Sequence, residues 1–86
     1  MPNNFEVAVG GNALIRVFVD NSPLVVNAGT GSANLPPGQY VLSWVVLGAP
    51  GDTYSLEITK PVSAAWKASA ILDISGKDAG IHWVVI

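Results

Sequence analysis

Few side chains of this 86-residue sequence could carry out chemistry, and they are scattered along it. His82 is the only histidine, so acid–base catalysis would need an aspartate beside it, yet no spacing brings Asp20, Asp52, Asp73 or Asp78 there. The lack of cysteine excludes thiolate chemistry, disulfides and cysteine-bound zinc. The acidic residues stand singly, without the spacing of a calcium-binding loop. We therefore predict a non-catalytic protein with no metal or cofactor, and a small enzyme that uses His82 is the least favoured alternative.

The stretch of small residues from 27 to 38 is the one candidate for ligand binding. Its Gly29-Thr30-Gly31-Ser32 segment has the glycines of a phosphate-binding loop, but no lysine follows and no helix is predicted. Its hydroxyl and amide groups could instead bind a sugar beside an exposed tryptophan. The predicted ligand-binding residues are Asn27, Thr30, Ser32 and Asn34. A lectin-like carbohydrate-binding module, multivalent through oligomerisation, is accordingly the alternative function.

Charge and the start of the sequence bear on partners and location. Four basic residues stand against six acidic ones, for a net charge of −2. No basic stripe is available to contact nucleic-acid phosphates or an anionic membrane, so neither partner is expected. The sequence does not open with a basic segment followed by an apolar one, so no secretory signal is predicted. The default expectation is a cytoplasmic protein, with export by a signal-independent route left open.

The elements that must position these residues are strands. Apolar residues recur with period two between turns rich in glycine, proline, asparagine and aspartate, which is typical of an all-β chain. About seven short strands are predicted, at residues 5–9, 13–19, 24–26, 39–47, 53–59, 66–74 and 81–86. A tight hairpin is expected at 10–12, a long loop at 27–38, and a helix through 62–72 is the alternative to the sixth strand. Residues 1–86 thus form a single domain, a compact antiparallel β-sandwich of immunoglobulin-like or jelly-roll-like type.

One short segment supports the sandwich. Leu35-Pro36-Pro37-Gly38-Gln39-Tyr40 resembles the proline-glycine turn and following tyrosine that enter a strand in many bacterial immunoglobulin-like and peptidase-associated β-sandwich modules. The resemblance covers six residues. It implies a sandwich fold and carries no function.

Two predicted strands, Tyr40 to Leu47 and Ile81 to Ile86, are apolar on both faces. A strand covered on one side only should alternate, so the second face needs a cover. Charged residues are also only 12% of the chain, against about 25% in ordinary domains. We predict a homo-oligomer, a dimer or trimer, acting as a self-associating interaction or structural module, with another protein as the alternative cover. The predicted interface residues are Phe18, Val45, Leu47, Val84 and Ile86, and Val84→Lys is expected to dissociate the oligomer.

Overall fold

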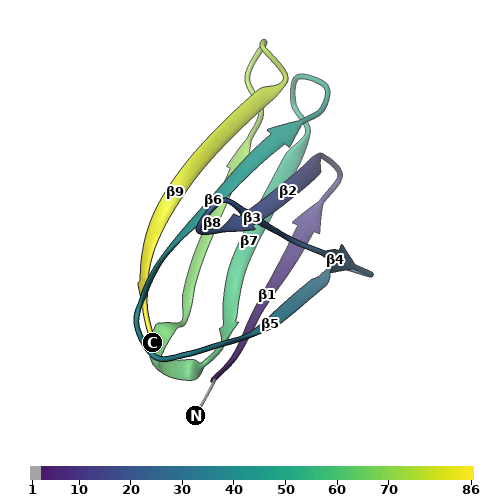
Figure 1. Cartoon of the computed structure of the whole chain (residues 1–86). Helices are drawn as coiled ribbons and strands as arrows, with labels where there is room; N and C mark the ends of the chain where they lie inside the picture. Colours follow the sequence, from purple (N-terminus) through teal and green to yellow (C-terminus); the bar gives the residue numbers. More distant parts are fainter. Residues whose placement is uncertain (1–2) are drawn as a thin grey trace.

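The computed structural model describes residues 3–86 as two antiparallel sheets packed face to face (Figure 1). Sheet A has, in spatial order, β4 (Val26–Asn27), β5 (Thr30–Leu35), β1 (Asn3–Gly11), β7 (Thr53–Lys60) and β8 (Trp66–Ile71). Sheet B has β3 (Ser22–Leu24), β2 (Leu14–Val19), β6 (Gln39–Leu47) and β9 (Lys77–Val85). The all-β sandwich is confirmed, with two more strands than the seven expected.

The core lies between the sheets and is filled by alternate side chains of the long strands. In β7 the inward residues are Tyr54, Leu56 and Ile58, which confirms the predicted alternation. Opposite them, β6 contributes Leu42, Trp44 and Val46. The remaining buried apolar side chains are Phe5, Val7, Val17, Val19, Leu24, Leu72 and Val84. Each long strand therefore buries the side chains of one face in the core, because successive side chains along a strand alternate between its two faces.

The predicted hairpin at residues 10–12 is wrong, because the chain there passes from one sheet to the other. Strand β1 pairs with β5 and β7 in sheet A, whereas β2 begins sheet B. Gly11 has a φ of 92°, and a Cβ at this position would collide with the Thr53 backbone. The side chain of Asn12 then accepts a hydrogen bond from the Thr53 amide at 2.8 Å. These turn residues join the two layers of the sandwich instead of closing a ladder.

The predicted loop at 27–38 is also wrong, since it contains the last residue of β4 and the whole of β5. Ala28 and Gly29 both have positive φ, at 54° and 81°, as a two-residue type I′ hairpin requires. β5 then pairs with β1 over six residues. Gly31 faces inward under the Val25 carbonyl, where a Cβ would lie 2.8 Å from that oxygen. The strand was missed because its side chains are small and polar, although their alternation is regular.

The other boundaries differ by a few residues. β9 begins at Lys77, four residues before the strand predicted at 81–86, and β8 ends at Ile71, three residues before the end predicted for its strand, which leaves Ile74 exposed. Within residues 62–72, for which a helix was the alternative prediction, only Val62–Ala64 is helical, as a single 3-10 turn (η1). The Tyr40 hydroxyl donates to the Pro36 carbonyl at 2.6 Å, which ties the proline-glycine turn to the start of β6.

Candidate functional site

The outer face of sheet B is a nearly continuous apolar surface. The ladder places its outward side chains in rows across β2, β6 and β9: Leu14, Leu47 and Lys77; Arg16, Val45 and Ala79; Phe18, Ser43 and Ile81; Val41 and Trp83; Gln39 and Val85. Ile81 and Trp83 are each 67% exposed and Val85 is 63% exposed. We call this set the sheet B face. Large apolar patches of this kind mark interaction surfaces in folded proteins.

Charge on the sheet B face is separated between its two ends. Lys77 lies in the first row and Arg16 in the second, whereas the exposed Asp20 lies beside the Val41 and Trp83 row, where its carboxylate accepts a hydrogen bond from the Val41 amide at 2.8 Å. The opposite end carries the neutral Gln39 beside Val85. The face is therefore apolar through its middle and cationic at one end, and the Asp20 carboxylate lies near the other end.

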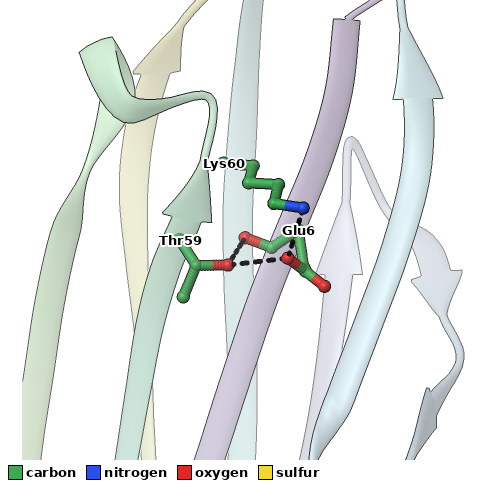
Figure 2. A network of polar contacts seen from close by, with 3 residues as sticks. All are labelled: Glu6, Thr59 and Lys60. Carbon is green, nitrogen blue, oxygen red and sulfur yellow. Dashed lines mark hydrogen bonds and ion pairs between the residues drawn. The ribbon is translucent and has the colours of Figure 1, made fainter.

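The outer face of sheet A is polar by contrast. Its ladder sets Glu57 opposite Lys67, Ser55 opposite Ser69 and Glu6 opposite Ser32. At the bulge between β1 and β7, the Lys60 ammonium lies 3.6 Å from the Glu6 carboxylate. Figure 2 shows this ion pair together with Thr59. The Thr59 hydroxyl is 3.2 Å from both the Glu6 carbonyl and its carboxylate. Such a face is satisfied by water and needs no cover.

His82 lies on the inner face of β9 and closes the open side of the sandwich. Its ring stacks on Trp66 of β8, with centroids 4.0 Å apart and an interplanar angle of 8°. Trp66 in turn packs against Trp44 at 5.4 Å. The hydrogen bonds of Asp20, Asp52, Asp73 and Asp78 in residues 3–86 all go to other groups. His82 thus has an aromatic neighbour and no carboxylate aligned with it, which gives no acid–base pair.

A polar chain crosses the core between the sheets. The Tyr54 hydroxyl of β7 donates to the Asp78 carboxylate of β9 at 2.7 Å, and the Trp44 indole N–H lies 3.4 Å from the Tyr54 oxygen. Burial raises the pKa of Tyr54 above its ordinary value, and the hydrogen bond to Asp78 adds to this increase. These hydrogen bonds join the three side chains to one another, so the network links the two sheets and does not form an open site.

The predicted ligand-binding residues do not meet a tryptophan. Thr30, Ser32 and Asn34 follow one another along the exposed face of β5, and Asn27 pairs with Thr30 in the adjoining β4. Of the tryptophans only Trp83 is largely exposed, and it faces outward from the other sheet. The polar side chains of β4 and β5 and the exposed Trp83 indole therefore lie on opposite outer faces of the sandwich. The fold does not bring them together into the sugar site that the sequence predicted.

The predicted interface residues divide into two groups. Val45 and Leu47 are exposed on the sheet B face and Phe18 is half-buried there. Val84 is only 3% exposed, and Ile86 packs against the core, so both assignments are corrected. The register sets Trp83 opposite Val41, which turns Val84 inward. Because both parities of this strand are apolar, the sequence could not tell them apart, and the outward Ile81, Trp83 and Val85 were missed.

Comparison with known proteins found no match that bears on function. No protein-family model matches the chain, and no curated protein or solved structure matches it significantly. Within residues 3–86, no three metal-binding side chains gather into a cluster. The same residues include no helix that is long and apolar enough to span a membrane.

Proposed function

We propose that this protein is a non-catalytic module that associates with a second copy of itself through the sheet B face. The observation that carries the proposal is the row of exposed apolar side chains over β6 and β9, led by Ile81, Trp83 and Val85. Burying such surface is favourable by roughly 25 cal/mol per Å². The core gains nothing from these residues, since the inward faces of both strands already fill it.

The size of the face suits a contact between two proteins. Four strands about 4.8 Å apart, with nine residues of about 3.3 Å each in β6 and β9, outline roughly 430 Å² once the shorter β2 and β3 are allowed for. The accessible area over protruding side chains exceeds that outline. A specific contact buries about 800 Å² on each partner, so the outline of one face is about half of what a dimer needs.

The charges favour an antiparallel arrangement of the two copies. Two sheets stack with their strands within about 30° of one another, and a two-fold axis applies the same patch to both partners. With strands running in the same direction, Arg16 and Lys77 of each copy would face one another. With opposed strands, each cationic end lies over the end that holds Gln39 and has Asp20 nearby. Like-charge contact is avoided only in the second arrangement.

A matched pair of lysine substitutions tests the proposal. Trp83→Lys sets a charge in the middle of the sheet B face and is expected to give a monomer that still folds. Ile71→Lys replaces a similarly exposed residue, 72% accessible, on β8 of the other sheet, and is expected to leave the mass unchanged. Sedimentation velocity measures both. An unchanged mass for Trp83→Lys, with loss of association for Ile71→Lys, would assign the contact to sheet A.

A further inference from the structure

A second surface lies at the opposite edge of sheet B, beside β2. Strand β3 has three residues and pairs only with Val17, Phe18 and Val19, after which the chain turns away toward β4 (Figure 1). The space left beside the first half of β2 is a groove of about 360 Å³. That volume lies within the range of ligand-binding clefts, about 300 to 1,000 Å³.

The backbone of Ile15 opens into this groove. Pro23 has no N–H, so its pair with Phe18 is the non-hydrogen-bonded kind, and the amides of Val17 and Val19 point toward β3. The even-numbered residues point toward β6, as the Asp20 amide shows by donating to the Val41 carbonyl at 2.9 Å. By the same alternation the N–H and C=O of Ile15 point away from β6. The β3 pairing stops at Val17, so no strand in residues 3–86 meets them.

The side chains around the groove set the chemistry of an occupant. Its walls are apolar and include Leu24, Val26 and Val25, of which Val25 is 80% exposed. Arg16 stands at the rim and makes no ion pair with any carboxylate in the described residues. An unpaired guanidinium beside an apolar groove favours an anionic group on an otherwise apolar ligand.

We propose that this groove binds an extended peptide segment of another protein, which adds a strand beside β2. Such a segment would exchange backbone hydrogen bonds with Ile15, direct apolar side chains toward Leu24 and Val26, and direct an acidic side chain toward Arg16. Strand addition of this kind draws affinity from the main chain and specificity from alternate side chains. The groove opens at the outer edge of β2, but Leu14, Arg16 and Phe18 line it and also belong to the sheet B face, so a bound peptide and a second copy would compete for these side chains.

Synthetic peptides test the groove directly. The probe is acetyl-Thr-Val-Glu-Val-Thr-amide, added to the whole ¹⁵N-labelled protein, with amide shifts and hydrogen exchange followed by NMR. We expect shifts confined to the Leu14 to Val17 stretch and to Val25 and Val26, and slower exchange at Ile15. The control peptide, N-methylated at both valines, cannot donate to the β2 edge and is expected to leave the spectrum unchanged. Equal shifts with both peptides, or none with either, would overturn the proposal.

The charge requirement has its own control. Replacing the peptide's glutamate by glutamine is expected to weaken binding about two- to fivefold, the range of an exposed ion pair. In the Arg16→Gln protein the two peptides should bind equally. A preference for the glutamate peptide that survives Arg16→Gln would contradict the assignment to Arg16. Slower exchange at the Ile15 amide that follows protein concentration and not peptide would assign the groove to a second copy and overturn the proposal.

Discussion

The two outer faces of this sandwich share one strand geometry but have opposite chemistry. On sheet A the outward positions hold Glu6, Ser55, Glu57 and Lys67, whose ladder sets acid near base and hydroxyl near hydroxyl. On sheet B the equivalent positions of the long strands are mostly valine, isoleucine, leucine and tryptophan. Alternation along a strand fixes which residues face the core and leaves the outer face free to differ. One outer face is therefore polar and suited to water, whereas the other is apolar, and the proposed self-association uses the apolar one.

The largest loss of stability is expected when a lysine is placed on the inward side of β9, compared with one placed on its outward side. Val84→Lys would place an ammonium in the core, where the penalty is several kcal/mol per ion, comparable to a whole stability of about 5 to 15 kcal/mol. We expect this variant to unfold, in place of the dissociation that the sequence alone predicted. Thermal melting by circular dichroism measures it against Trp83→Lys, which should melt near the wild-type temperature. Equal melting temperatures for Val84→Lys and wild type would contradict the assigned parity.

A smaller loss is expected from Gly80→Ala on the inner side of the same strand. A Cβ at Gly80 would meet the Trp44 indole, which lies across this glycine in the adjoining strand. Overpacking of this kind costs about 1 to 3 kcal/mol. Ala79→Ser, the neighbouring change on the outer face, is the control and should stay within about 0.5 kcal/mol. Urea unfolding resolves the two, and equal midpoints would mean that Trp44 does not rest on Gly80.

The polar tie across the core is expected to contribute about 1 to 3 kcal/mol. Tyr54→Phe removes the hydroxyl that joins Trp44 to Asp78 and leaves both without this partner. The pKa of Tyr54 is raised in the folded protein, so its contribution is fully present below pH 10.0 and is lost as pH rises through the folded pKa. Between pH 9 and 11 the wild type should therefore lose more stability than Tyr54→Phe in urea titrations. Parallel losses would remove Tyr54 as the cause.

The smallest expected effect is a change in the dissociation constant that distinguishes an antiparallel from a parallel arrangement of the two copies. If the copies lie antiparallel, Gln39→Glu brings a carboxylate near the partner's cationic end, and each new pair strengthens association by about 0.2 to 1 kcal/mol. Gln39→Lys should weaken association to a similar degree. Dissociation constants from fluorescence dilution measure both. A parallel arrangement would bring the two copies of residue 39 together, and both variants would then weaken the dimer.

The sequence predicted the parts of the fold that alternate between apolar and polar residues, and failed where either kind was missing. The pattern of Tyr54, Leu56 and Ile58 fixed the core face of β7 because its partners are polar. β5 was taken for a loop, since Thr30, Ser32 and Asn34 alternate with small residues and show no hydrophobic contrast. The sequence predicted β9 as a strand, but because its residues are apolar on both faces, it could not show which of them face the core. The predicted interface residue was therefore Val84 and not the exposed Trp83. Only pairing with β6 settles that choice.

The most direct test of the account is the molar mass of the wild-type protein by light scattering over a dilution series. We expect a dimer at high concentration that dissociates on dilution, with the Trp83 fluorescence shifting as its ring enters water. A mass of 8.9 kDa at every concentration would contradict it, because the sheet B face would then stay exposed without a second copy to cover it.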